Sequence, residues 1–338
     1  MDFSKNISLE TANLNIGYGN KVIYENLNLT LRSGTVTCLL GQNGVGKSTL
    51  LKTLAGLIEK SGGEISIDQQ SIEAFDQRRL AKCLSMVTTD KLDMGALSVM
   101  DVLMAGRYPY QTWISSPSET DFKAIEEAID QTKINYLIDK KISELSDGQR
   151  QKVMIARALV QNGEIILLDE PTAHLDLTNR VEIMRLLREI SSGSDKAILI
   201  STHELSLALQ YADQLWLMNF GEDLLSGVPE DLALSGDLDR IYHHQEFEYD
   251  LVTGKVKDAK RERDKLEIQA EPKILHWIRN ACDRVQITVK KNVLIEAEMD
   301  KNLLKWKINH DSESYNGVTI DELLKQLQAI EYEPPANK

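Results

Sequence analysis

The chain has 338 residues, a net charge of −13 at pH 7 and 42% apolar residues. This length allows one large and one small domain, and the negative charge argues against nonspecific binding of nucleic acid or anionic lipid as the main activity. The longest apolar runs, such as Ile165–Leu168 and Ala197–Ile200, are much shorter than the roughly 20 residues that span a bilayer. The N-terminus lacks the pattern of a secretory signal, so we expect a cytoplasmic protein.

The amino-terminal region is predicted to form strands, then a glycine loop and a helix. Residues 7–32 are predicted to be strands of an antiparallel sheet, because leucines at 27, 29 and 31 alternate with polar residues. A further strand, 35–40, leads into the sequence GQNGVGKSTLLKTLAGLI, in which apolar residues recur at helical spacing after Lys47. This order places a glycine-rich turn at the start of a helix.

The segment Gly41–Ser48 is the first candidate binding site. It matches the pattern G-x-x-x-x-G-K-[ST] between a predicted strand and a predicted helix. Backbone N–H groups of such a loop and the helix N-terminus hold phosphates, Lys47 reaches the β and γ phosphates, and the Ser48 hydroxyl can bind Mg²⁺. The alternative, a glycine turn that carries Lys-Ser by chance, is disfavoured by the strand-to-helix context.

The segment Glu144–Val160 is predicted to start a helix, because Ser146 and Gln149 form a capping box ahead of an apolar stripe at helical spacing. This helix does not explain Gly148, since glycine in a helix is about 1 kcal/mol less favourable than alanine. Its presence indicates that another group approaches the backbone closely.

Two buried strands near 165–169 and 197–202 are predicted on either side of a helix at about 179–190. Strands that alternate with helices indicate an α/β fold with a parallel core sheet. Asp169 and Glu170 end the first strand, at the edge of the sheet where ligands bind.

His203 ends the second strand. A lone histidine at such a position is more often a hydrogen-bonded structural residue, and a carboxylate pair is more often a strand end that meets solvent. Their proximity to a phosphate loop favours a functional role for both.

The composition changes after about residue 255. Residues 256–271 are rich in charge and are predicted to be a linker. Residues 272–338 are predicted to form a small α+β domain that ends in an amphipathic helix capped by Thr319 and Glu322. We expect this domain to stabilise a dimer or to sense a ligand or a partner.

The motifs GQNGVGKST, LSDGQ, IILLDE, AHLD and STH occur in this order, and with them the chain resembles the ATP-binding cassette (ABC) ATPases. LSDGQ is the most specific, because it departs from the family pattern L-S-G-G-Q only at Asp147. The resemblance implies a P-loop NTPase domain over 1–255, with a mixed core sheet, an antiparallel β subdomain and a helical subdomain at about 90–160.

The resemblance also implies residue roles. Glu170 would be the general base, His203 and Lys47 would contact the γ-phosphate, and Asp169 and Ser48 would hold Mg²⁺. Two copies would pair head to tail, with Asp176 in the interface. The implied ATP-binding residues are Tyr18, Gly41, Gln42, Asn43, Gly44, Val45, Gly46, Lys47, Ser48, Thr49, Ser146, Gly148, Gln149 and Asp176; Tyr18 would stack on adenine or serve only as a turn residue.

Two positions depart from the family pattern. Where the family usually has a glutamine that contacts Mg²⁺, this chain has Thr89. Its side chain is shorter than that of glutamine, and Thr89 is a candidate metal-site residue. Asp147 replaces a glycine of the signature, and the helix dipole favours a carboxylate in the first turn by about 0.3–1 kcal/mol.

The segment Leu97–Trp113 is similar to ATPases of importers for iron chelates, siderophores, haem and cobalamin, mainly through GRYPY at Gly106–Tyr110. The resemblance implies a homodimer under two transmembrane permease subunits at the cytoplasmic face of the plasma membrane, with a substrate-binding protein as an indirect partner. The alternative is a soluble ABC protein that uses ATP as a conformational switch outside transport. GRYPY itself could dock a permease helix or pack locally.

Overall fold

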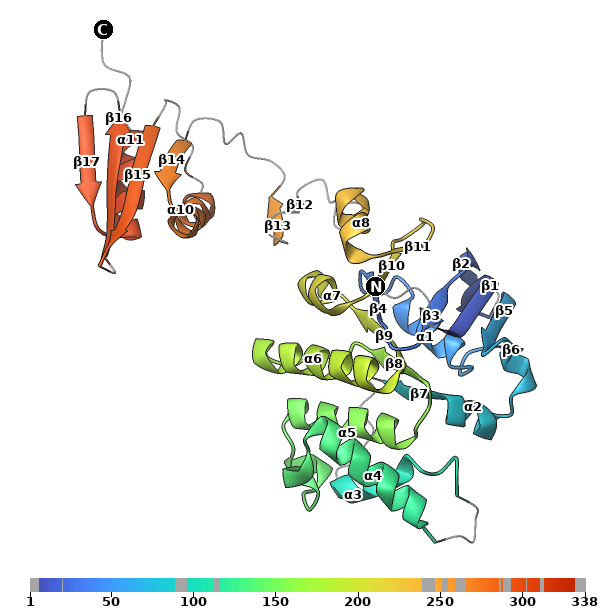
Figure 1. Ribbon diagram of the computed structural model, residues 1–338. Helices are drawn as coiled ribbons and strands as arrows, with labels where there is room; N and C mark the ends of the chain where they lie inside the picture. Colours follow the sequence, from blue (N-terminus) through green and yellow to red (C-terminus); the bar gives the residue numbers. More distant parts are fainter. Residues whose placement is uncertain are drawn as a thin grey trace. The chain divides into compact units, whose positions relative to one another are not determined.

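The chain folds into two compact units, Met1–Lys257 and Asp258–Lys338 (Figure 1). We call them the large unit and the small unit. The computed structural model describes residues 6–19, 21–88, 96–111, 116–238, 247–250, 255–258, 266–285, 287, 293–301, 303–310 and 313–331.

A six-stranded sheet forms the centre of the large unit, with the strand order β11-β10-β4-β9-β8-β7. The five strands from β10 to β7 are parallel, and β11 is antiparallel to β10. Strands buried on both faces read as continuous apolar runs, as β4, β8 and β9 do. The strands are β4 Val36–Gly41, β7 Leu84–Val87, β8 Ile165–Asp169, β9 Ala197–Thr202, β10 Gln214–Met218 and β11 Leu225–Gly227.

An antiparallel sheet packs over one face of the central sheet. Its order is β2-β1-β5-β6, with β3 paired to β1. Leu9 and Leu14 of β1, Leu50 of α1 and Trp216 of β10 belong to one buried cluster, which fills the space between the two sheets. The strands are β1 Ile7–Tyr18, β2 Lys21–Leu27, β3 Thr30–Arg32, β5 Gly62–Ile67 and β6 Gln70–Ser71.

The other face of the central sheet is covered by helices that share a second buried cluster (Figure 1). Here α3, α4 and α5 form a helical subdomain, as predicted. The helices of the large unit are α1 Lys47–Leu54, α2 Gln77–Cys83, α3 Val99–Ala105, α4 Glu119–Thr132, α5 Asp147–Val160, α6 Leu177–Ser194, α7 Leu205–Tyr211 and α8 Pro229–Leu234, with 3₁₀ turns at Ile72–Ala74, Asn135–Leu137 and Ile142–Glu144. The predicted architecture of a mixed core sheet with an antiparallel β subdomain and a helical subdomain is therefore confirmed.

Cys38 is a free cysteine that is buried in the central sheet. Burial raises the pKa of the Cys38 thiol to about 12, so the thiol is inert, as its position in β4 suggests. No helix in the described part of the chain is both long enough and apolar enough to be a membrane span.

The small unit is a four-stranded sheet in the order β14-β15-β16-β17, in which only β14 and β15 are parallel. Side chains of α10 and α11 share a buried cluster with the sheet, including Ile278, Trp306 and Leu323. The elements are β14 Leu266–Ala270, α10 Pro272–Arg284, β15 Val293–Asp300, β16 Leu303–His310, β17 Glu313–Gly317 and α11 Ile320–Glu331.

The predicted linker at 256–271 needs a correction. Its last part is β14, in which Leu266, Ile268 and Ala270 alternate with exposed polar residues and pair with β15. The high charge of this segment concealed the period of a strand. Before it, β12 Phe247–Asp250 and β13 Lys255–Asp258 form a separate two-stranded sheet.

Candidate functional site

The glycine loop between β4 and α1 wraps around the lysine that follows it. Gly44 and Gly46 have φ of 82° and 118°, a region that side-chain-bearing residues rarely adopt. The buried Lys47 ammonium donates to the Gly41 carbonyl at 2.9 Å and to the Gln42 carbonyl at 3.2 Å. The first N–H groups of α1 have no carbonyl in the helix to bond, so the loop combines several donors with a fixed cation.

The remaining members of the predicted phosphate segment divide by exposure. Val45 and Thr49 are buried and anchor the loop, whereas Gln42, Asn43 and Ser48 are exposed. The exposed members are the ones that a ligand in the loop can reach.

Three predicted residues converge because β4, β9 and β8 are neighbouring parallel strands. Leu40 pairs with Thr202, and Asp169 pairs with Ser201, so the segments that follow these strands meet at one edge of the sheet. Lys47 Nζ lies 3.4 Å from Glu170 Oε1, and His203 Nδ1 lies 3.4 Å from Glu170 Oε2. Each oxygen of the Glu170 carboxylate thus faces a different nitrogen.

Ser201 holds the two carboxylate residues and was not among the predicted site residues. Its hydroxyl donates to Asp169 Oδ1 at 2.6 Å and accepts from the Glu170 backbone N–H at 2.9 Å. Glu170 has φ of 44°, a left-handed conformation that costs a non-glycine residue roughly 1–3 kcal/mol and is common at functional sites. The only sequence signal for Ser201 was its place in the STH motif.

Asp169 and Ser48 fit a magnesium ion that is shared with a phosphate ligand. Asp169 is 5% exposed and has one oxygen on Ser201, which leaves Oδ2 for another partner. No group of three or more His, Cys, Asp or Glu side chains in the described residues could hold a metal. Mg²⁺ takes one or two protein ligands and completes its shell with water and substrate phosphates, so one carboxylate and one hydroxyl are the kind of ligand set that it uses.

The signature segment forms the predicted cap. Ser146 caps α5, with Gln149 N–H donating to Ser146 Oγ at 3.3 Å and Ser146 N–H donating to Gln149 Oε1 at 3.1 Å. The structure gives Gly148 a contact that the sequence did not reveal. A Cβ on residue 148 would lie 2.9 Å from Cγ and Oδ1 of Asn179, in the first turn of α6.

Asp176 caps α6 and thereby fixes the loop before it. It accepts hydrogen bonds from the backbone N–H of Asn179 at 2.8 Å. The neighbouring Arg180 donates to the Leu175 carbonyl at 2.6 Å and to Glu204 Oε2 at 3.1 Å, while Glu204 Oε1 accepts from the Thr172 hydroxyl. Glu204 directly follows His203, so this network connects the loop at 175–176 with the strand end of β9.

Tyr18 and Thr89 are the two outlying candidates. Tyr18 is 54% exposed at the end of β1, where it is opposite Lys21 of β2 in the strand register. The β2 residues Ile23 and Tyr24 lie beside Gly46. The ring is therefore accessible on a hairpin that contacts the glycine loop. Thr89 lies outside the described residues.

The GRYPY segment divides into an inward part and an outward part. Arg107 is buried, donates to Asp121 Oδ1 at 2.7 Å and to the Val160 carbonyl at 2.9 Å, and lies 3.8 Å from the centre of the Tyr110 ring. These contacts join α3, α4 and α5. Tyr108, by contrast, is 70% exposed.

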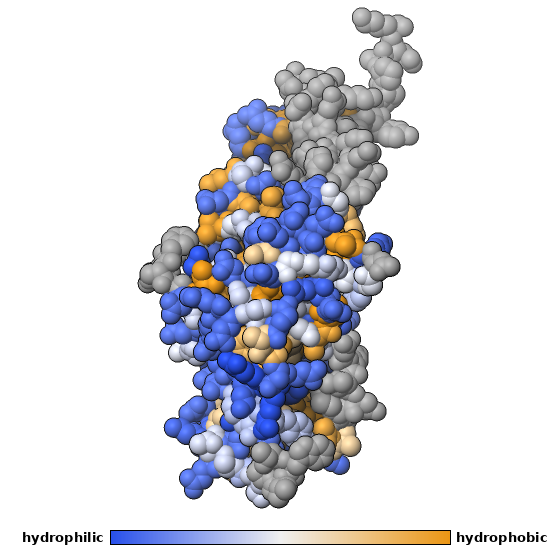
Figure 2. Space-filling model, turned by 90° about the vertical axis from the view of Figure 1, so that its right-hand side faces the viewer, coloured by the Kyte–Doolittle hydropathy of each residue, from blue (hydrophilic) through white to orange (hydrophobic). Residues whose placement is uncertain are grey.

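The helical subdomain has large hydrophobic side chains that are exposed, namely Leu97, Tyr108, Phe122 and Tyr136. On the face shown in Figure 2, hydrophobic residues form small patches between hydrophilic ones.

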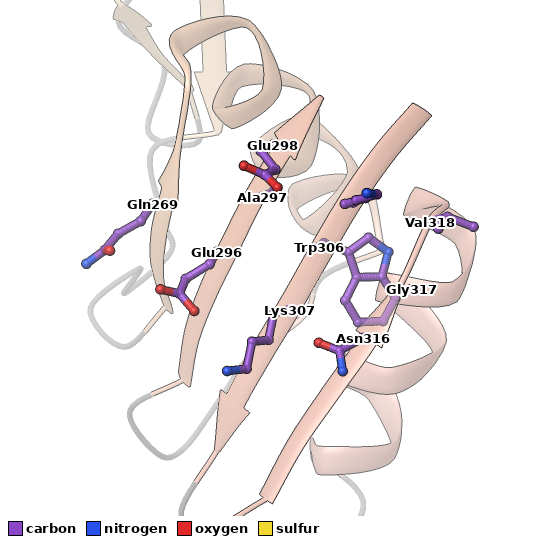
Figure 3. Close-up of a pocket in the computed structure, with 10 residues that line it drawn as sticks. Gln269, Glu296, Ala297, Glu298, Trp306, Lys307, Asn316, Gly317 and Val318 are labelled. Carbon is purple, nitrogen blue, oxygen red and sulfur yellow. The ribbon is translucent and has the colours of Figure 1, made fainter. Parts of the chain in front are cut away.

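The small unit has a surface hollow of its own, of about 670 Å³, which none of the predicted site residues lines (Figure 3). Acidic and basic side chains face each other across neighbouring strands here, with Glu296 opposite Lys307 and Glu298 opposite Lys305. The hollow therefore has no net excess of one charge from these four residues.

Comparisons with known proteins agree with the geometry of the large unit. A family model described as ABC transporter matches residues 24–173. The chain is 36% identical to the petrobactin import ATP-binding protein FpuD of Bacillus anthracis over 226 residues, 67% of this chain and 83% of that protein. It is 32% identical to the ferric enterobactin transport ATP-binding protein FepC of Escherichia coli K12 over 234 residues, 69% of this chain and 86% of that protein.

A solved structure has the same fold. The structure of cbiO1 from Clostridium perfringens, part of the ABC transporter complex cbiONQ, superposes with a TM-score of 0.61 at 31% identity and covers 70% of this chain and 94% of its own. The 226 and 234 residues shared with the two relatives, and the 70% of the chain shared with this structure, are slightly fewer than the residues of the large unit, Met1–Lys257.

Proposed function

The chain belongs to the family of ABC transporter ATP-binding subunits, and from that premise we propose that it acts as a homodimer that drives the import of a ferric chelate. As a member of this family it binds nucleotide and is an ATPase that supplies energy to an importer. The observation that supports the residue roles below is the convergence of Lys47, Glu170 and His203 at three neighbouring strand ends.

Hydrolysis requires an oriented water molecule and compensation of phosphate charge. In the proposed site, the loop N–H groups and the Lys47 ammonium bind the β and γ phosphates, and Glu170 accepts the proton of the attacking water. His203, which lies against Oε2 of Glu170, orients this carboxylate and contacts the γ-phosphate. Ser48 and Asp169 would hold Mg²⁺, which neutralises phosphate charge when bound.

The second half of each site comes from another copy of the chain. Ser146 and Asp176 are exposed, although they belong to motifs that in this family contact ATP. In a head-to-tail dimer, Ser146, the Gly148 backbone and Gln149 of one copy would reach the γ-phosphate bound by the other. ATP binding then closes the dimer and hydrolysis opens it.

The importer partner is proposed to be a pair of transmembrane permease subunits, with this chain as a peripheral subunit on the membrane. Tyr108 and Phe122 are exposed on the helical subdomain and offer apolar area for a permease helix. The names of the relatives favour a ferric chelate as the transported substrate. They do not favour the alternative of an ABC protein outside transport.

Reconstitution tests this proposal. The chain is purified with its permease in lipid vesicles, and ATP hydrolysis is measured with a substrate-binding protein that is empty, loaded with a metal-free siderophore or loaded with the ferric siderophore. We expect stimulation by the ferric form only. Equal rates in all three conditions, or recovery of the chain with ribosomes instead of a membrane protein, would contradict an importer of ferric chelates.

A further inference from the structure

We propose that Asn179 is a positioning residue that sets the placement of Gly148 relative to Asp176. These two residues lie on different elements, the first turn of α5 and the loop before α6, and the inference rests on the proposed function, in which both face the ATP bound by the partner copy. In that arrangement Asn179 acts through its hydrogen bonds to Asp176 and its contact with Gly148.

Asn179 engages both oxygens of the Asp176 carboxylate. Its backbone N–H donates to Oδ1 at 2.8 Å, and its side-chain amide donates from Nδ2 to Oδ2 at 2.8 Å. The first bond is an ordinary helix cap, which any residue except proline can supply at this position. The second bond requires the side chain, so it is specific to Asn179 and fixes the orientation of the carboxylate.

The same amide also packs against Gly148. A Cβ on residue 148 would lie 2.9 Å from both Cγ and Oδ1 of Asn179 and 3.3 Å from Nδ2. Such a contact is too close to keep, and the amide cannot rotate away without losing its bond to Asp176. The contact with Asn179 in the same chain therefore explains the glycine at position 148, in addition to the proposed approach of a phosphate bound by the partner copy.

This arrangement couples the two elements. A shift of the loop at 175–176 moves the Asp176 carboxylate. The carboxylate then moves the Asn179 side-chain amide, which packs against Gly148. Closure of the dimer requires both elements to meet the partner at once, and small errors in such placements reduce the rate of chemistry strongly. The cation at Lys47 is held by its own loop and by Glu170, so it does not depend on Asn179.

A double-mutant cycle on the full chain tests the coupling. The variants are Asn179→Ala, Gly148→Ala and the double variant, with Thr178→Ala as the matched control, because Thr178 is an exposed residue of the same helical turn. The measurements are kcat for ATP hydrolysis, the affinity for a fluorescent ATP analogue, and the thermal unfolding midpoint. The midpoint shows which variants are folded.

We expect Asn179→Ala to lower kcat about tenfold, through misplacement of Gly148 and Asp176, with nucleotide affinity unchanged. We expect Gly148→Ala to lower kcat more than Asn179→Ala does. The double variant should have a kcat at least about threefold higher than that of Gly148→Ala alone, because the effects of substitutions at two residues in contact are not additive. Wild-type kcat in Asn179→Ala, or effects of the two substitutions that simply multiply, would overturn the proposal.

Failure of the proposed hydrolysis site gives a different result. In that case Glu170→Gln hydrolyses ATP at the wild-type rate. The coupling between positions 148 and 179 is then still measurable from the unfolding midpoints.

Discussion

The large and small units use their polar residues in different ways. In the large unit, Lys47, Asp169 and Ser201 are at most 5% exposed. At the strand ends, Ser201 donates a hydrogen bond to Asp169, and Lys47 forms an ion pair with Glu170. In the small unit, charged residues of β15 and β16 such as Glu296 and Lys307 are exposed and form opposite-charge pairs across the sheet (Figure 3).

The difference indicates where each unit carries its function. Burying a polar or charged group is costly unless partners compensate, so a buried cluster of such groups at strand ends indicates selection for chemistry. Exposed pairs on a sheet are solvated and contribute little. We therefore propose that the large unit alone carries out ATP hydrolysis, and each prediction below tests that proposal.

Lys47→Ala should have the largest effect on turnover. The substitution removes the cation at the loop, and we expect ATP hydrolysis to fall by about 100-fold or more, since loss of one preorganised donor has effects of this size. Hydrolysis and nucleotide affinity are both measured, with Lys52→Ala in the last turn of the same helix as the control. Equal losses in the two variants would show a general effect on α1.

Ser201→Ala should have an intermediate effect. It removes the hydroxyl that bonds Asp169 and the Glu170 N–H, so Glu170 is less well placed and kcat falls about tenfold. Ser194→Ala is the control, because its hydroxyl bonds the Ile190 carbonyl far from the site. A kcat of Ser201→Ala that matches this control would remove Ser201 from the positioning role.

Removal of the small unit should leave turnover nearly unchanged. A chain that ends at Lys257 keeps both buried clusters of the large unit intact, because no described residue of the small unit belongs to them. We expect ATP hydrolysis within a factor of about two of the full chain, since separate cores fold separately. A large loss of hydrolysis or of ATP-driven dimerisation would show that the small unit stabilises or regulates the dimer.

Asp121→Asn should change the pH dependence of stability and have the smallest effect on turnover. Burial raises the pKa of Asp121, but hydrogen bonds from Ser118 and from Arg107 outweigh this effect and hold the pKa of the carboxyl below its usual value. A carboxylate whose pKa is lower in the folded state than in the unfolded state stabilises the fold fully at pH values above the unfolded-state pKa. This contribution is lost as the pH falls through the folded-state pKa.

Urea unfolding between pH 7 and pH 3 measures this effect. The free energy of unfolding of the wild type should exceed that of Asp121→Asn most at neutral pH, and the difference should shrink in the acid range. A difference that is constant with pH would show that the charge of Asp121 does not contribute.

The convergence of the site could be predicted from the sequence because each motif adjoins a strand. The phosphate loop follows β4, Glu170 follows β8 and His203 follows β9, and the strands of a parallel α/β sheet place their carboxyl ends at one edge. Local patterns with a fixed place in the fold were therefore sufficient for Lys47, Glu170 and His203.

Contacts between distant segments could not be predicted in this way. The Gly148–Asn179 contact depends on how α5 packs on α6, and the Arg107–Asp121 ion pair depends on how the turn after α3 packs on α4. No single segment encodes that packing. The strand β14 was missed for a different reason, because its charged flanks gave the composition of a linker. The GRYPY segment also shows what the sequence leaves open, because only the structure distinguishes the buried Arg107 from the exposed Tyr108.

The most direct test of the account is a single-turnover measurement on Glu170→Gln. The full-length variant is mixed with radiolabelled ATP and Mg²⁺, and the bound nucleotide and the oligomeric state are determined over time. Glu164→Gln, at the opposite end of β8, is the matched control. We predict that Glu170→Gln binds ATP, accumulates as a dimer and hydrolyses at least about 100-fold more slowly than the control; hydrolysis at the control rate would contradict the assignment of Glu170 and of the site at these strand ends.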